Sequence, residues 1–155
     1  MGFQIFALDI DRFAHLFDQD DEALAKEGVR RIVVDSDPGY PCRVSLRDAG
    51  IGETVLLMNY EHQPAPTAYR SSHAIFVRER ACQASPEKNE VPGMFRHRLL
   101  SVRAFDASGM LIGADIVDGR RLESLIGPML ANEAAAYLHI HTARPGCYAA
   151  LVRRC

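Results

Sequence analysis

The sequence lacks the features that mark several large classes of protein. It has no run of lysine or arginine longer than two residues, and its 20 acidic residues outnumber its 18 basic ones, for a net charge of −2. Nucleic-acid-binding domains usually carry a basic patch, so this balance argues against a nucleic-acid partner. No apolar run approaches the roughly 18 residues of a membrane-spanning helix, and Met1–Phe6 has no basic region of the kind that opens a signal peptide. We therefore expect a cytoplasmic protein without a membrane partner.

Cysteine is sparse and scattered. The four cysteines are Cys42, Cys82, Cys147 and Cys155. None forms a C-x-x-C pair, and in a reducing compartment each is expected to be a free thiol. Cys42 precedes Arg43 and Cys147 lies near Arg144, and a neighbouring cation can activate a thiol as a nucleophile. The alternative for both is a quiet place in the core, since free cysteine is among the most buried residue types.

A chain of 155 residues fits one domain, residues 1–155, because domains most often contain roughly 100–150 residues. Alternating and β-branched segments predominate, and helical spacing is confined to the start and the end of the chain. We expect strands over 4–8, 30–35, 42–46, 54–62, 72–80, 99–105, 110–117, 135–142 and 147–153, and helices over 9–17, 20–27 and 118–130. This order predicts an α+β fold, a mainly antiparallel β-sheet with two or three helices packed on it.

Two segments are expected to be irregular. Gly127-Pro128 lies inside the last predicted helix and should kink or shorten it, because proline removes a backbone donor. Residues 81–97 show no clear period and contain two prolines and a glycine. They predict a mobile surface loop with a helical turn near 94–97.

The densest group of chemically capable side chains lies in Tyr137–Tyr148. If 135–142 is a strand, Leu138 and Ile140 face the core, and His139 and His141 lie on the opposite face. Both imidazoles can then reach one point, which suits two metal ligands or a base and its neighbour. Candidates for a third ligand are His73, His62, Cys147 and Cys42. The alternative is a pair of half-exposed histidines on the wet face of the sheet.

Arginines near the ends of predicted elements indicate an anion site. Arg144 precedes the turn at Pro145-Gly146, which would hold it in a fixed direction. Arg70 is followed by Ser71 and Ser72, a guanidinium and two hydroxyls that can hold a carboxylate or phosphate. Arg43 and Arg103 are further candidates. For each arginine taken singly, the alternative is a solvated side chain.

Aromatic residues accompany the histidines. If strands 54–62 and 72–80 form a hairpin, His62 and His73 lie at the same end of the sheet. Tyrosines supply flat walls with polar tips, which suits a small-molecule pocket and equally the rim of a core. Those near the histidines are Tyr60, Tyr69, Tyr137 and Tyr148.

Five blocks of sequence resemble a known family. They are P-G-Y-P-C-R-V-S-L (38–46), L-L-x-N-Y-E-H (56–62), Y-R-x-S-H-A-I-F-V (69–77), L-L-S-V-R-A-F-D-A-x-G-M (99–110) and Y-L-H-I-H-x-A-R-x-G-C-Y (137–148). In this order they resemble the bacterial family catalogued as domain of unknown function 1203. The resemblance covers nearly the whole chain and implies one complete bacterial domain. It assigns no catalytic residue and no cofactor.

Three functional hypotheses follow from these residues. The first is a small-anion-binding protein or enzyme, with or without a divalent metal, that gathers His73, His139, His141, Arg144 and Cys147 around one pocket. Its catalytic residues would be the histidines and the thiol, and its ligand-binding residues would be Arg144, Arg43, Arg70, Ser72, Tyr60, His62 and Tyr148. The second is a non-catalytic structural or interaction module that forms a homodimer through an edge strand. The third is a thiol-dependent redox protein that uses Cys42 and Cys147.

Overall fold

The computed structural model describes residues 2–155. Within this range the strands are β1 (Phe3–Phe6), β2 (Arg30–Val33), β3 (Thr54–Gln63), β4 (Ser71–Arg78), β5 (Leu99–Phe105), β6 (Leu111–Asp118), β7 (Tyr137–Thr142) and β8 (Tyr148–Arg154). The helices are α1 (Ala14–Phe17), α2 (Asp21–Lys26), α3 (Gly93–Arg96) and α4 (Glu123–Ala131), with short 3-10 helices η1 (Ile10–Arg12) and η2 (Gly119–Arg121). None of the helices in the described part of the chain is long and apolar enough to cross a membrane.

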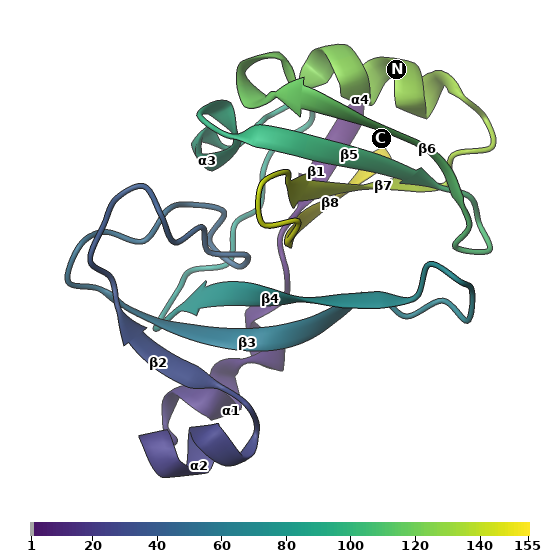
Figure 1. Ribbon diagram of the computed structural model, residues 1–155. Helices are drawn as coiled ribbons and strands as arrows, with labels where there is room; N and C mark the ends of the chain where they lie inside the picture. The colour runs from purple at the N-terminus through teal and green to yellow at the C-terminus, as the bar shows by residue number, and fades with distance from the viewer. Residues whose placement is uncertain (1) are drawn as a thin grey trace.

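The strands form two antiparallel sheets, one above the other in Figure 1. The larger sheet has the order β1-β8-β7-β5-β6, and the smaller has the order β2-β3-β4. The first and last strands pair, with Phe3 opposite Arg154, so the two ends of the chain lie together. The predicted α+β class is confirmed. The strands divide into two sheets instead of one, and residues 79–98 carry the chain from β4 in the small sheet to β5 in the large one.

Helix α4 covers one face of the five-stranded sheet (Figure 1). Its buried residues Ile126 and Leu130 join the apolar side chains of β5 and β7 in one hydrophobic cluster. Those strand residues are Leu100, Val102, Ala104, Leu138 and Ile140. Full burial of such a side chain stabilises the fold by about 1.5–3 kcal/mol. The helix contains Pro128 and ends three residues later, at Ala131. The other face of β5 and β7 is thereby left for polar side chains.

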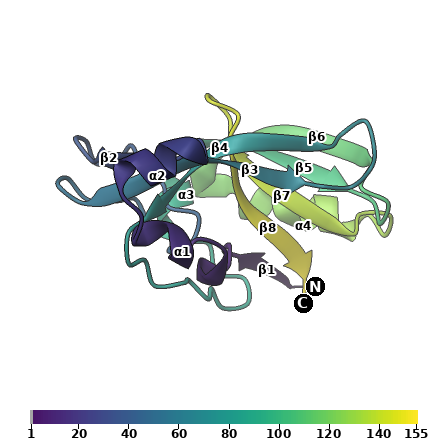
Figure 2. The same cartoon turned by 90° about the horizontal axis from the view of Figure 1, so that it is seen from below.

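The N-terminal helices pack against the small sheet. Figures 1 and 2 place α1 and α2 beside β2 and β3. Asp20 caps α2 by accepting a hydrogen bond from the backbone N–H of Ala23 at 2.8 Å. Leu16 and Leu24 are buried in a second hydrophobic cluster together with Ile75 of β4. That cluster also includes Tyr148 of β8, so the two sheets contact each other there.

The prediction of a strand over 42–46 is wrong. This segment has only isolated bridges, one of them between Cys42 and Phe76, and then turns back on itself. The backbone N–H of Leu46 donates to the carbonyl of Cys42 at 3.0 Å, and Leu46 has a left-handed φ of 50°. All five residues are buried, so the alternating pattern of the sequence does not correspond to one solvent-exposed face and one buried face. The segment is instead a buried loop.

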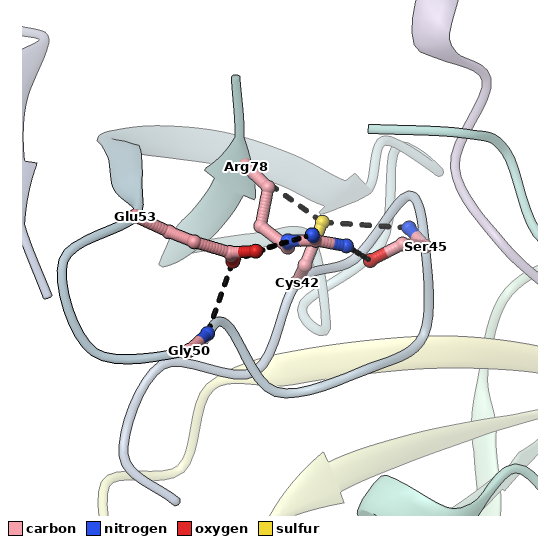
Figure 3. A network of polar contacts seen from close by, with 5 residues as sticks. All are labelled: Cys42, Ser45, Gly50, Glu53 and Arg78. Carbon is pink, nitrogen blue, oxygen red and sulfur yellow. Dashed lines mark hydrogen bonds and ion pairs between the residues drawn. The ribbon is translucent and has the colours of Figure 1, made fainter. Parts of the chain in front are cut away.

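A polar network fixes this loop on β4 (Figure 3). Arg78 donates to both carboxylate oxygens of Glu53, at 2.8 and 2.7 Å, and Glu53 also accepts from the backbone N–H of Gly50 at 3.0 Å. The sulfur of Cys42 accepts from the backbone N–H groups of Ser45 and Arg78, at 3.4 and 3.3 Å. These contacts make Cys42 a buried structural acceptor and hold the neighbouring Arg43 in place.

Candidate functional site

Four histidines meet between the two sheets, and we call this group the histidine cluster: His62, His73, His139 and His141. His139 and His141 come from β7, on the face opposite α4, as the alternation predicts. His73 comes from β4. His62 comes from β3, where the pairing with β4 shifts register between Tyr60 and Gln63. His62 is buried, as Leu56 and Met58 are, at the alternate positions of β3 that share one face.

The imidazole nitrogens lie close together. His62 Nε2 and His73 Nδ1 are 2.8 Å apart, and His62 Nδ1 and His139 Nδ1 are 3.4 Å apart. His141 stands nearly perpendicular to His62, with ring centroids 4.8 Å apart. One nitrogen from each of His62, His73 and His141 lies within 4.8 Å of the other two. The predicted convergence of β7 histidines with His62 and His73 is therefore a feature of the structure.

His141 has one satisfied and one unsatisfied nitrogen. Its Nδ1 lies 2.9 Å from the carbonyl oxygen of Gly146, and because a carbonyl only accepts, Nδ1 carries the proton. Its Nε2 then presents a lone pair, and this atom is buried without a hydrogen-bond partner. Gly146 has a φ of 80°, a conformation that glycine adopts without strain, and this turn aims its carbonyl at His141.

Burial keeps the cluster neutral. Loss of hydration, together with the nearby Arg103 and neighbouring histidines, lowers the pKa of His62 to about 4, of His139 to about 3 and of His141 to about 2. Loss of hydration also lowers the pKa of His73. Within residues 2–155 no carboxylate forms an ion pair with any of the four. At neutral pH the site thus offers unprotonated nitrogen donors.

Other side chains complete the surroundings of the cluster. Tyr148 stacks on His62, with ring centroids 5.2 Å apart and planes 6° from parallel, and burial raises the pKa of its hydroxyl. The hydroxyl of Ser71 lies 3.2 Å from His62 Nε2. Arg103 is opposite His139 in the β5–β7 pairing and is half-buried. Ser71, instead of its exposed neighbour Ser72, contacts the cluster, because Ser71 and His73 lie two residues apart on β4 and share a face.

The other predicted site residues lie elsewhere. Arg43, Arg144 and Cys147 line a separate cavity of about 510 Å³, together with His97, Arg98 and Thr142. None of the four clustered histidines lines it. The structure therefore distributes the residues expected around one pocket over two places. Sequence reasoning did not include His97 and Arg98, which lie between α3 and β5 and follow no motif or spacing.

Two further candidates are on the surface. Arg70 is exposed and pairs with Glu61 at 3.0 Å. Tyr60 is half-buried, and its hydroxyl accepts a hydrogen bond from Arg12 at 3.1 Å. Its ring is tilted against that of Tyr148 at a centroid distance of 5.9 Å, so Tyr60 packs against the tyrosine that stacks on His62.

Fold and site together define an α+β protein whose two antiparallel sheets enclose neutral histidines. The chain belongs to the family described as "Protein of unknown function (DUF1203)", whose model matches residues 39–154. That span includes all four histidines and the lining of the cavity. No curated protein and no solved structure matches the chain.

Proposed function

We propose that the protein binds a divalent transition metal, zinc or a close relative, through His62, His73 and His141. The observation that carries this proposal is the buried, unpartnered Nε2 of His141. An unsatisfied polar atom in a protein interior is costly, and each one calls for an explanation such as an ion. A metal ion supplies the missing partner, and the hydrogen between His62 Nε2 and His73 Nδ1 moves to another ring nitrogen when both residues bind it.

The donor set supports this assignment. Imidazole nitrogen suits zinc, copper and nickel, and catalytic zinc sites typically use three protein ligands and leave one position open. Ligand nitrogens around a tetrahedral ion bonded at about 2.0–2.1 Å are about 3.3 Å apart. The three histidine nitrogens lie within 4.8 Å of one another, so modest side-chain rotations bring them to that spacing. The hydrogen bond from His141 Nδ1 to Gly146 is the kind of outer contact that orients ligating histidines.

The surroundings favour an enzyme or binding protein for a small anion. A metal with an open position acidifies bound water and polarises oxygen atoms of a substrate. Arg103, beside the cluster, adds a positive charge that attracts a carboxylate or phosphate. His139 is a neutral imidazole 3.4 Å from His62, a position suited to proton transfer. Hydrolytic and isomerase reactions of small anions are the classes to assay.

Metal analysis tests the proposal. We expect untagged protein dialysed against zinc to retain about one equivalent per chain, and His62→Ala and His141→Ala to lose it. His15→Ala is the matched control, because His15 is exposed on α1 and lies outside the cluster. Replacement of zinc by cobalt should give the visible absorption of a four-coordinate site. Parent protein that retains no more metal than His141→Ala would refute the proposal.

A homodimer without catalysis is the second candidate. Strand β6 forms one edge of the large sheet, and Ile112 and Ile116 on it are 37% and 59% exposed. Exposed apolar edge strands invite pairing with another chain. A molecular mass of one chain by light scattering at high concentration would exclude this alternative. Ile116→Lys should dissociate a dimer that forms through β6.

We also propose that the protein works in the cytoplasm. Its four cysteines are free thiols, and Cys82 and Cys155 are exposed. Exposed thiols persist in a reducing compartment. Fractionation of cells that express the tagged protein tests the assignment.

A further inference from the structure

A second site is built around the cavity of about 510 Å³, which we call the arginine cavity. It lies among the buried loop, the small sheet, the connection from α3 to β5, and the β7–β8 turn. Its apolar lining comprises Pro41, Leu57, Ala74, Phe76, Leu99 and Pro145. Its size falls within the roughly 300–1,000 Å³ of small-molecule pockets. No aspartate or glutamate is among its lining residues.

Arg43 is the central feature of the cavity. Arg43 is 2% exposed, and its Nε donates to the carbonyl of Tyr148 at 2.8 Å while Nη1 donates to the carbonyl of Pro41. Within residues 2–155 it forms no ion pair with a carboxylate. Burial lowers its pKa to about 10, which still leaves it charged at pH 7. A buried guanidinium without an anionic partner is unfavourable unless something compensates its charge.

The rest of the lining adds positive charge at the entrance. Arg144 is exposed on the β7–β8 turn, and no described carboxylate pairs with it. Arg98 also lines the cavity, but both of its terminal nitrogens contact Asp48, which neutralises it. The uncompensated charges are therefore Arg43 in the interior and Arg144 at the rim.

We propose that the arginine cavity binds a small organic anion, a carboxylate or phosphate attached to an apolar body. Arg43 would hold the anionic group from the interior and Arg144 from the rim. The apolar lining, with Leu57 and Phe76 from the small sheet, would contact the body of the ligand. The two carbonyl contacts fix the Arg43 fork before a ligand arrives, and such preorganisation favours bidentate recognition. This site is independent of the proposed metal site, because none of the clustered histidines lines it.

Cys147 provides a reporter inside the cavity. Cys147 lines the space and is half-buried, whereas Cys82 and Cys155 are exposed and lie outside the lining. Benzoate and phenyl phosphate are suitable probes, with inorganic phosphate as a probe that lacks the apolar body. We expect benzoate or phenyl phosphate to slow iodoacetamide alkylation of Cys147, measured by peptide mass spectrometry. Alkylation of Cys82 and Cys155 should be unchanged.

Arginine variants then assign the binding groups. Calorimetric titration of Arg144→Gln should show affinity weakened by about tenfold or more, the effect of losing a charge-assisted hydrogen bond. Arg43→Lys, which keeps the charge and loses the fork, should weaken binding at least as much while the melting curve shows a folded protein. Arg30→Gln is the matched control, since Arg30 is an exposed arginine of β2 outside the lining.

The outcomes are decisive in both directions. Preference for phenyl phosphate over benzoate, or the reverse, identifies the anionic group and supports the site. Equal affinity for inorganic phosphate and phenyl phosphate would refute the role of the apolar lining. The proposal is overturned if no probe protects Cys147 in the parent protein, or if Arg144→Gln and Arg43→Lys both bind like Arg30→Gln. Retained probe binding in His141→Ala would separate this result from the fate of the metal site.

Discussion

The histidine cluster and the arginine cavity flank the same β7–β8 turn, yet they are opposite in what they lack. In the cluster the unpartnered atom is an acceptor, the lone pair of His141 Nε2. In the cavity the uncompensated group is a donor, the guanidinium of Arg43. A buried acceptor needs a cation or a proton, and a buried cation needs an anion. The histidine cluster is therefore expected to bind a cation, and the arginine cavity an anion.

The shared turn explains how two such sites coexist. Gly146 turns its carbonyl toward His141, while Arg144, Pro145 and Cys147 in the same turn line the cavity. Burial acts differently on the two groups. The histidines respond to desolvation by remaining neutral, whereas arginine keeps its charge and depends on contacts with carbonyls. One turn can thus serve a cation site and an anion site without placing like charges together.

The largest expected effect is a double dissociation between the two sites. His141→Ala should reduce zinc affinity by more than about 100-fold, because loss of an outer contact alone typically reduces it 10–100-fold. The same variant should bind benzoate or phenyl phosphate like the parent. Arg144→Gln should show the reverse pattern. Competition with a chromophoric chelator measures the zinc affinity, and calorimetry measures the anion affinity. Parallel losses in both variants would show that the two places form one site.

Acid should destabilise the metal-free protein. The folded pKa of His62, about 4, lies below the value of about 6.5 in an unfolded chain. Between these values the unfolded chain binds more protons, so the free energy of unfolding decreases as pH falls from 6.5 towards 4. For each histidine that stays neutral in the folded protein, the free energy of unfolding should decrease by about 2 kcal/mol between pH 7 and pH 5.

Urea unfolding at the two pH values measures this loss. A His139→Gln variant removes one such group and should show a smaller decrease than the parent. Arg43 contributes no comparable dependence, since it remains charged throughout this range. A free energy of unfolding that does not change between pH 7 and pH 5 would contradict the assignment of neutral, buried histidines.

The two sites also differ in how far sequence could predict them. The period of two along β7 gave the correct faces, with Leu138 and Ile140 against α4 and His139 and His141 on the other side. The hairpin of β3 and β4 brought His62 and His73 to one end of the sheet, as expected. No local pattern in the sequence marks the register shift after Tyr60, which pairs Ser71 with Gln63.

The arginine cavity was beyond prediction for a different reason. Arg43 was expected on a strand and lies in a buried loop, where Leu46 has a left-handed φ and Cys42 accepts backbone hydrogen bonds. Its partner, the carbonyl of Tyr148, is 105 residues away along the chain. Local propensity carries no information about contacts of this range, so Arg43 and Arg144 were assigned to the histidine pocket instead of to a cavity of their own.

A smaller effect is expected from Gly146→Ala. At a φ of 80° an alanine costs about 1–2 kcal/mol, and the carbonyl that orients His141 should shift. We expect lower stability in urea and weaker zinc binding. Gly28→Ala is the matched control, because Gly28 has a φ of 73° and an added Cβ there, as at Gly146, contacts nothing within 4 Å. Equal zinc affinity in the two variants would show that the turn does not orient the site.

The smallest effect tests whether the surface arginine suggested by sequence belongs to either site. Arg70 pairs with Glu61, but both side chains are largely exposed, at 63% and 43%. Water screens such a pair, so Arg70→Ala should change the free energy of unfolding by no more than about 0.5 kcal/mol. Zinc and anion affinities should both equal those of the parent. A clear loss of anion affinity in Arg70→Ala would mean that the hydroxyl of Ser71 and the guanidinium of Arg70 act together beside His62. The protein would then have two anion sites, the arginine cavity and a second site next to the metal.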